Sequence, residues 1–344
     1  MVLQVIPAIM RVPRFAGDGL IDEVERVVPE PGQGELLIRV MANALCASER
    51  PQLAKGSRVT PGHEAAGVVA AAGPGTRVTV GTPGVVYLMD YCGACRSCRL
   101  GYTNQCLQKR GDMGFTVDGG YGVYEVVHES IFFPVDAELS PAEATLLLDV
   151  MGTTGHAIRR AQLVRPDIAS VLVMGAGPVG LGAVAMAKVL LGRDVPVLVA
   201  DVVPYRLALA ERLGGQPVHL GETSVAAAVR DGGLGTVDVA VDTSGKGVAR
   251  RDAVDVLAKR GALVCVGHGE ELALQVSPDL IAPERAVLGS EYFRYDELAG
   301  NLELLRAHRA YLAQIVTHRF GIGELQRAFE VFFGRETGKV VIEQ

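Results

Sequence analysis

The chain has 344 residues, of which 49% are hydrophobic. Because single domains usually hold about 100 to 200 residues, this length predicts two domains with enough apolar material for two cores. With 33 Lys and Arg against 39 Asp and Glu, the net charge of -6 argues against nucleic acid or an anionic membrane surface as a partner.

The N-terminal stretch MVLQVIPAIM is apolar, but it has neither a basic flank nor a small-residue cleavage site. We therefore interpret it as a first strand and not as a signal peptide. No run approaches the roughly 20 apolar residues that a membrane helix needs. The sequence thus predicts a soluble, cytoplasmic protein.

Residues 1–147 predict a mainly β domain. Short β-branched runs, such as LLIRVMAN and EAAGVVAAAG, alternate with turns rich in Gly and Pro. No long amphipathic helix interrupts them.

Four cysteines lie close together in this domain, with the spacing Cys-x2-Cys-x2-Cys-x7-Cys: Cys92, Cys95, Cys98 and Cys106. Four thiolates complete the tetrahedral coordination that zinc prefers, and such a closed shell leaves no position for a substrate. The pattern predicts a structural zinc site whose loss unfolds the lobe. An iron–sulfur cluster is the alternative, although the last gap and the lack of a following Pro do not suit the usual ferredoxin run.

Residues 148–284 predict a doubly wound parallel sheet of the Rossmann type. Fully apolar strands such as SVLVM and PVLVAD alternate with helical stretches, as a sheet covered on both faces requires. Residues 285–344 then supply two helices and a last strand, GKVVIE, which we expect to return to the first domain. The nucleotide domain is then inserted between two segments of the mainly β domain.

The turn after the first strand of this sheet carries a glycine motif: Gly175, Ala176, Gly177, Pro178, Val179 and Gly180. Gly175 permits a tight turn, Gly177 lets the backbone approach a pyrophosphate, and Gly180 allows close helix packing. The N-terminus of the helix that follows offers free N–H groups to the phosphates. These residues predict a dinucleotide site.

Asp201 ends the next strand, where its carboxylate can accept both ribose hydroxyls of an adenosine and repel a 2′-phosphate. We therefore expect NAD. NADP is the alternative, because the nearby Arg206 could bind a phosphate, although a place beside the adenine ring or on the surface also explains this cation. A helix cap is the alternative role for Asp201.

Several motifs in one order resemble the zinc-containing medium-chain alcohol and polyol dehydrogenases. They are Cys46-Ala47-Ser48-Glu49, Gly62-His63-Glu64, the four-cysteine lobe, Asp118-Gly119-Gly120-Tyr121, the glycine motif and Gly338-Lys339-Val340-Val341. The resemblance covers essentially the whole chain. It implies a GroES-like catalytic domain that holds an inserted Rossmann domain, two zinc ions per subunit, NAD and a homodimer or homotetramer.

In this family a catalytic zinc has three protein ligands and one open position for water or a substrate oxygen. By resemblance, Cys46 and His63 are two of the ligands, and Asp149 is the third. A cap or a salt bridge at a domain junction is the alternative role for Asp149, and a buried core thiol is the alternative for Cys46. The resemblance also makes Glu64 an outer or alternate ligand and Glu49 the carboxylate that orients His63.

Ser48 is expected to take the hydroxyl proton of the substrate, with an ordinary turn hydroxyl as the alternative. In many relatives a His two or three residues downstream ends the proton relay, but Arg50 and Pro51 stand here. The proton then leaves by the ribose and water or through another group. Thr153 is placed beside the cofactor. The stretch GSEYFRYDEL around Arg294 resembles the family segment that approaches the cofactor, and the resemblance suggests a pyrophosphate contact from Lys339.

The loop between Cys46 and His63 contains RPQLAKGSRVTPG, which is short, basic and polar. It favours a small hydroxylated or anionic substrate, and we expect a secondary alcohol of the polyol, cyclitol or sugar-like kind. Two other functions stay open. One is a zinc-free quinone or enoyl reductase, against which the cysteines and His63 argue; the other is a non-catalytic dinucleotide-binding sensor or structural protein.

Overall fold

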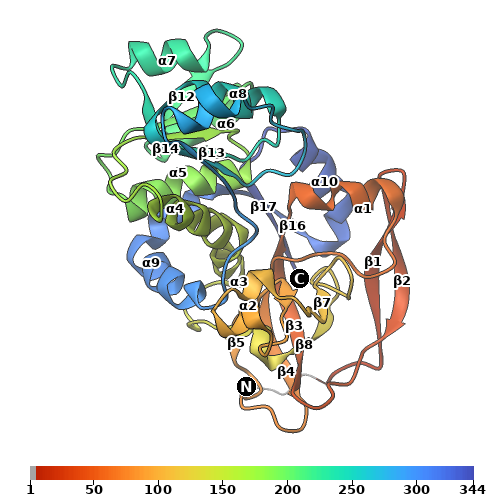
Figure 1. The fold of residues 1–344 in the computed structure, drawn as a ribbon. Helices are drawn as coiled ribbons and strands as arrows, with labels where there is room; N and C mark the ends of the chain where they lie inside the picture. Colours follow the sequence, from red (N-terminus) through yellow and green to blue (C-terminus); the bar gives the residue numbers. More distant parts are fainter. Residues whose placement is uncertain (1–4) are drawn as a thin grey trace.

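The computed structural model describes residues 5–344, which form two large sheets with helices around them (Figure 1). The predicted first strand falls in part on residues 1–4, which lie outside the described residues; the first strand, β1, begins at Ile9. No helix in the described part of the chain is both long and apolar enough to cross a membrane.

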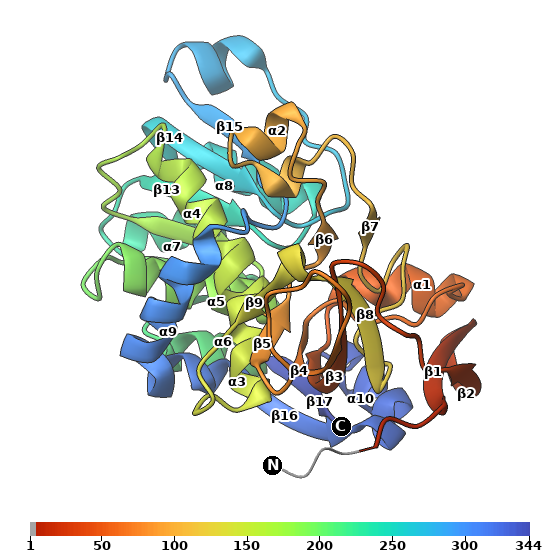
Figure 2. The same ribbon diagram turned by 90° about the horizontal axis from the view of Figure 1, so that it is seen from below.

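The first sheet has seven strands, which come from residues 35–134 and from the C-terminal residues 316–343. Its path is β16-β17-β3-β4-β5-β9, and β8 also pairs with β3. The C-terminal strand lies antiparallel to β3, with Val341 opposite Ala44, and Figure 2 shows β16 and β17 beside β3 and β4. The strands are β3 (Glu35–Ala44), β4 (Ala65–Ala72), β5 (Pro83–Val86), β8 (Tyr124–His128), β9 (Phe132–Pro134), β16 (Val316–Gly321) and β17 (Lys339–Glu343).

Smaller elements surround this sheet. An antiparallel hairpin, β1 (Ile9–Gly17) and β2 (Leu20–Val27), packs against α1 (Arg50–Lys55) and α10 (Leu325–Phe333). Phe15 of the hairpin meets Phe329 of α10 edge to face, with ring centroids 5.3 Å apart. The cysteine lobe lies between β6 (Met89–Asp90) and β7 (Gly111–Asp112) and contains α2 (Arg96–Arg99). The short helix α3 (Pro141–Ala144) begins at a capping box formed by Ser140 and Glu143.

The second sheet has six parallel strands in the order β12-β11-β10-β13-β14-β15. Leu172 and Met174 of its central strand belong to one hydrophobic core and Val171 and Val173 to the other, so the sheet is covered on both faces. The strands are β10 (Val171–Met174), β11 (Val197–Asp201), β12 (Gln216–His219), β13 (Val237–Asp242), β14 (Leu257–Cys265) and β15 (Ala286–Gly289). The helices are α4 (Thr154–Gln162), α5 (Pro178–Leu190), α6 (Pro204–Arg212), α7 (Val225–Asp231), α8 (Gly247–Asp255) and α9 (Glu297–Leu312).

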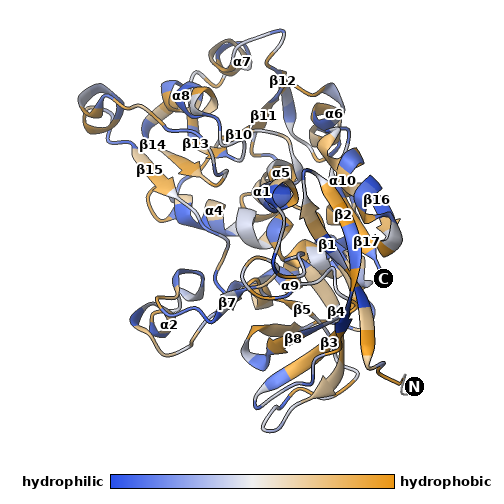
Figure 3. Cartoon of the chain, turned by 90° about the vertical axis from the view of Figure 1, so that its right-hand side faces the viewer, coloured by the Kyte–Doolittle hydropathy of each residue, from blue (hydrophilic) through white to orange (hydrophobic). Residues whose placement is uncertain are grey.

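The strand pairing corrects one predicted boundary. Ala286 pairs with Ala262 of β14, so β15 is the sixth strand of the nucleotide sheet and the return to the first sheet begins after Gly289 and not at residue 285. As an edge strand, β15 alternates between half-buried and exposed residues, although its sequence, AVLG, is apolar. Figure 3 colours β14 and β15 as hydrophobic beside helices with hydrophilic faces.

Candidate active site

The glycine motif forms a turn that tolerates no larger residue at two positions. Gly175 has a φ of +94°, a conformation that favours glycine. A Cβ on Gly180 would lie 1.9 Å from the carbonyl oxygen of Gly175. Helix α5 starts directly after Gly177, so its free N–H groups face the space above the turn. This geometry fits the cradle that a pyrophosphate requires.

Asp201 lies at the carboxyl end of β11, beside this turn. Its Oδ2 accepts the backbone N–H of Ala176 at 2.6 Å, and its Oδ1 accepts those of Val202 and Val203 at 2.7 and 2.9 Å. These bonds fix the carboxylate at the adenosine end of the predicted nucleotide site. Arg206 is close by, since its Nη1 lies 3.7 Å from the position that a Cβ on Gly177 would occupy. Burial lowers the pKa of the Arg206 guanidinium, and the Asp201 charge opposes that effect.

Four side chains from three separate segments converge beside the first sheet. One donor atom from each of Cys46, His63, Glu64 and Asp149 lies within 4.8 Å of the others. Cys46 follows β3, His63 and Glu64 precede β4, and Asp149 begins a short π-helical turn, Asp149–Thr153. A thiol, an imidazole and carboxylates form a donor set that zinc binds, with bonds of about 2.0 to 2.3 Å.

Backbone geometry explains how His63 reaches this position. Gly62 has a φ of +100°, and a Cβ there would lie 2.7 Å from the backbone nitrogen of Tyr121. Nδ1 of His63 lies 3.1 Å from Oε1 of Glu49, while its Nε2 lies 3.7 Å from Oδ2 of Asp149. The hydroxyl of Tyr121 donates to Oε2 of Glu49 at 2.9 Å. The Glu49 side chain is therefore long enough to orient His63, with Nε2 directed at the other donors.

The charges of these groups depend on one another. Burial raises the pKa of the Cys46 thiol, and the Asp149 carboxylate raises it further. Burial would lower the pKa of His63, but its hydrogen bonds to Asp149, Cys46 and Glu49 raise it well above the usual value. A divalent metal ion bound here would displace the protons of the Cys46 thiol and the His63 imidazole, because both groups coordinate only when deprotonated.

Lys339 and Glu64 form a buried ion pair behind the ligand set. The Lys339 side chain is 1% exposed, and its ammonium donates to Oε1 of Glu64. The predicted contact of Lys339 with the cofactor is therefore wrong, because β17 carries this side chain into the first domain, where a buried ammonium requires a carboxylate. Burial and the nearby Asp149 charge raise the pKa of Glu64, and the Lys339 ammonium opposes that rise. Its Oε2 has no hydrogen-bond partner within the described part of the chain, so this oxygen is available to a metal ion and the alternate-ligand prediction stays a prediction.

A cavity of about 650 Å³ joins the ligand set to the nucleotide domain. Cys46, Ser48, His63 and Asp149 line it on the side of the first domain, and Thr153 and Val179 line it on the side of the glycine motif. Ser290, Glu291 and Tyr292 of the stretch GSEYFRYDEL line the cavity, as the resemblance suggested, but sequence reasoning missed the other wall residues at the strand ends, namely Thr243, Ser244, Val266, Gly267 and His268. Their position at the carboxyl ends of β13 and β14, where α/β sheets bind ligands, is the signal that could have identified them.

The basic loop contributes less to this cavity than the sequence suggests. Arg50 and Pro51 line the cavity, and the Arg50 guanidinium lies 4.3 Å from the centroid of the Phe333 ring. Lys55 and Arg58 instead line a separate open hollow beside the β1–β2 hairpin.

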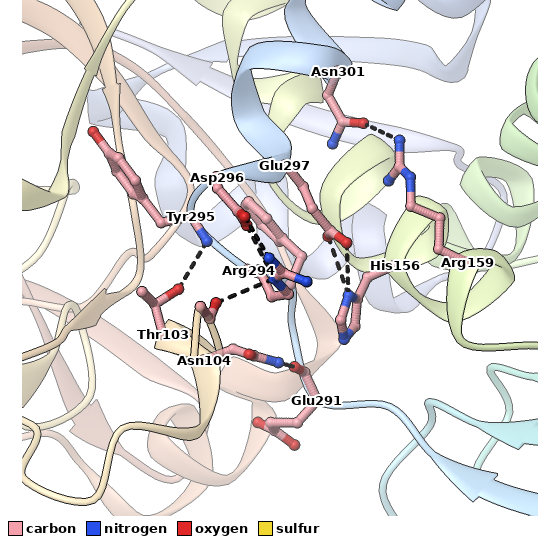
Figure 4. Close-up of polar contacts among 12 residues, drawn as sticks. Thr103, Asn104, His156, Arg159, Glu291, Arg294, Tyr295, Asp296, Glu297 and Asn301 are labelled. Atoms are coloured by element: carbon pink, nitrogen blue, oxygen red, sulfur yellow. Dashed lines mark hydrogen bonds and ion pairs between the residues drawn. The ribbon is translucent and has the colours of Figure 1, made fainter. Parts of the chain in front are cut away.

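A strap of residues 290–297 connects the nucleotide sheet to α9 and is fixed to the cysteine lobe (Figure 4). Asn104 Nδ2 donates to the carbonyl of Glu291 at 2.7 Å, and the backbone N–H of Tyr295 donates to Thr103 Oγ1 at 2.8 Å. Arg294 donates to the carbonyl of Gly101 at 3.1 Å and pairs with Asp296. The predicted approach of Arg294 to the cofactor is therefore wrong, because these acceptors hold its guanidinium against the lobe.

The strap is also bonded to the nucleotide domain. At its far end, Glu297 pairs with His156 of α4 at 3.1 Å, and one turn further along α9 Asn301 accepts a hydrogen bond from Arg159 (Figure 4). His156 therefore has a packing role between two helices.

The four lobe cysteines are free thiols whose sulfur atoms lie within 4.8 Å of one another. Backbone N–H groups point at the sulfurs: Cys95 donates to Cys92 at 3.3 Å, and Leu107 donates to Cys95 at 3.4 Å. Backbone hydrogen bonds lower the pKa of Cys95 to about 6. Donors of this kind stabilise thiolates, so the lobe fits a tetrahedral metal ion with four sulfur ligands.

Two family models match the chain: "Alcohol dehydrogenase GroES-like domain" over residues 32–137 and "Zinc-binding dehydrogenase" over residues 178–307. The chain is 31% identical over 337 residues to an L-threonine 3-dehydrogenase from Anaeromyxobacter sp., with coverage of 92% of this chain and 93% of the relative.

Two solved structures share the fold at lower identity. A short chain alcohol dehydrogenase from E. coli CFT073 complexed with NADH has a TM-score of 0.88 and 21% identity, with coverage of 98% and 100%. A putative zinc-binding dehydrogenase from Sinorhizobium meliloti bound to NADP has a TM-score of 0.86 and 24% identity, with the same coverage.

Proposed function

The chain belongs to the zinc-binding dehydrogenases that carry an alcohol dehydrogenase GroES-like domain, and from this membership we propose that it transfers a hydride between a secondary alcohol and NAD. The observation that carries the proposal is the shared cavity. Cys46, His63 and Asp149 line the same 650 Å³ space as Val179 of the glycine motif. A substrate bound there can contact the ligand set and the nicotinamide end of a dinucleotide together.

Cys46, His63 and Asp149 would hold the catalytic zinc, and the four lobe cysteines would hold the structural one. When bound, the catalytic zinc supplies Lewis acidity and the nicotinamide accepts the hydride. Glu49 holds the Nδ1 side of His63, which leaves Nε2 free to be a ligand. Ser48 lines the cavity and relays the substrate hydroxyl proton, because its Oγ can accept that proton while its own hydroxyl proton passes on to water. The ring of Phe115 packs against His63 with centroids 4.9 Å apart and excludes water from that side.

The proposed cofactor is NAD. Asp201 presents a carboxylate fixed by three backbone N–H groups at the end of β11, and such a carboxylate accepts ribose hydroxyls and repels a 2′-phosphate. Arg206 beside Gly177 is then a contact for the pyrophosphate or the adenine ring. For the substrate, we keep the polyol, cyclitol or sugar-like class.

An alcohol panel tests the reaction. The zinc-loaded protein is assayed with NAD and with NADP against polyols, cyclitols, simple secondary alcohols and L-threonine, and reduced nicotinamide is followed by absorbance. Cys46→Ser is expected to abolish turnover while the circular dichroism spectrum and melting temperature stay close to those of the wild type. If no alcohol produces reduced nicotinamide, the result would favour a non-catalytic dinucleotide-binding sensor. Reduction of quinones or enoyl substrates by the zinc-free protein would favour the zinc-free reductase.

A homodimer or homotetramer is part of the proposal. β15 is an edge strand of the nucleotide sheet, and Val276, Ile281 and Val287 on and beside it are exposed. An unpaired edge with apolar residues suits pairing with a second copy. Sedimentation velocity measures the state, and a monomer at micromolar concentration would contradict this part.

A further inference from the structure

One part of the cavity wall comes from the strand pair β6–β7 and carries two opposite charges. Lys109 and Asp112 both line the cavity, together with Leu88 and Met89. The Lys109 ammonium donates to both carboxylate oxygens of Asp112 at 2.8 Å. Phe115, three residues on, packs against the ring of His63. The ion pair therefore belongs to the wall that adjoins the proposed catalytic ligands.

The Lys109–Asp112 ion pair contributes little to the stability of the fold. Lys109 and Asp112 are three residues apart, and their side chains are 34% and 26% exposed. In the described part of the chain, neither charged group has a hydrogen bond to any other side chain. An ion pair exposed to this degree contributes little to stability.

A second ion pair on the same strands serves as a comparison. Arg110 pairs with Asp90, and neither side chain lines the cavity. The two pairs thus differ in the space that they face. Lys109 and Asp112 face the cavity, whereas Arg110 also donates to Ser130 Oγ at 3.3 Å.

The chemistry of a neighbouring ammonium and carboxylate suits a hydroxyl group. A hydroxyl can donate to a carboxylate and accept from an ammonium at the same time, whereas a lone cation would select an anion. Building on the proposed function, we propose that Lys109 and Asp112 bind hydroxyl groups remote from the oxidised carbon and so select a neutral polyhydroxylated substrate over a simple alcohol. The apolar Leu88 and Met89 would then cover the carbon skeleton.

Two pairs of substrates with matched skeletons test this role. Cyclohexanol and myo-inositol share a six-membered carbocycle, and 2-hexanol and sorbitol share a six-carbon chain, so each pair differs only in its remote hydroxyls. The ratio of kcat/KM for the hydroxylated and the simple member is measured for the wild type, Lys109→Met, Asp112→Asn and the control Arg110→Met. Loss of hydrogen bonds to charged groups is expected to lower that ratio by roughly 10- to 100-fold in the first two variants. The control should keep the wild-type ratio.

The outcomes separate this proposal from the proposed function. Equal ratios in Lys109→Met, Asp112→Asn and the wild type would overturn the role of the pair while the dehydrogenase activity stands. A wild type that prefers a hydroxy acid to a neutral polyol with the same skeleton would also overturn it, because the wall would then select anions.

If no alcohol is oxidised, the proposed function fails and calorimetry with the zinc-loaded protein decides on the pair. If the wild type binds myo-inositol or sorbitol and this binding weakens in Lys109→Met but not in Arg110→Met, the result supports the hydroxyl-binding role of the pair. If the wild type binds neither polyol, the result overturns that role.

Discussion

Replacement of Glu125 by Gln is expected to abolish a large pH dependence of stability. Glu125 in β8 is 1% exposed, and neither of its carboxylate oxygens has a hydrogen-bond partner among residues 5–344. Burial, with a smaller contribution from Asp118, raises its pKa from 4.5 to about 8. The folded protein therefore keeps this proton up to about pH 8, whereas the unfolded chain releases it near pH 4.5.

The sign follows from proton counting. Between these two pKa values the folded state binds more protons than the unfolded state, so the free energy of unfolding falls as the pH rises. At about 1.36 kcal/mol per pKa unit, the difference of about 3.5 units corresponds to a loss of roughly 5 kcal/mol, complete above pH 8. With an unfolding entropy near 2.1 cal/mol/K per residue, 344 residues unfolding together give a shift of about 7 °C.

The assay is the melting temperature of zinc-loaded wild type and Glu125→Gln between pH 5 and pH 9. Gln has the same shape and cannot ionise, so the two proteins should melt alike near pH 5, and the variant should melt several degrees higher at pH 9. The exposed Glu211→Gln serves as a control and should follow the wild type. Parallel curves for wild type and Glu125→Gln would refute the reasoning.

Three further changes test the metal and nucleotide sites. Cys95→Ser should lower the melting temperature and the zinc content by one ion per subunit, because three sulfurs no longer complete the tetrahedron; a stable variant that keeps both ions would contradict the structural role of the lobe. Glu49→Gln should weaken binding of the catalytic zinc by about 10- to 100-fold in competition with a chelator, since His63 loses its charged partner; unchanged affinity would show that Glu49 does not orient the ligand. Asp201→Ala should raise the KM for NAD and narrow the preference over NADP, measured as the ratio of the two kcat/KM values; an unchanged ratio would remove Asp201 from cofactor selection.

The sites that could be predicted from local sequence patterns are the cysteine lobe and the glycine motif. The four lobe cysteines and the glycine motif have fixed spacings within short segments, and each spacing follows from the coordination or backbone geometry that it serves. The proposed catalytic ligands come from three distant segments of the chain: Cys46, His63 and Asp149. Because no local spacing links these segments, the ligand set was predicted only from the family resemblance.

The errors have a common physical origin. Lys339 and Arg294 are long cations, which in a sequence suggest anion binding or an exposed surface. Their partners are Glu64 and the carbonyl of Gly101, which are remote in the chain and become neighbours only in the folded protein. Likewise, the boundary at residue 285 was wrong because β15 is a four-residue edge strand that lies beyond it and pairs with β14 only in the folded protein.

The strap of residues 290–297 links the two metal-related regions of the molecule. Ser290 and Glu291 at its start line the proposed reaction cavity, and Asn104 ties the Glu291 carbonyl to the cysteine lobe two residues before Cys106. Partial loosening of that lobe would therefore displace the cavity wall before the rest of the protein unfolds. A change of order in the lobe is therefore expected to reach the cavity wall through the bond from Asn104 to the Glu291 carbonyl.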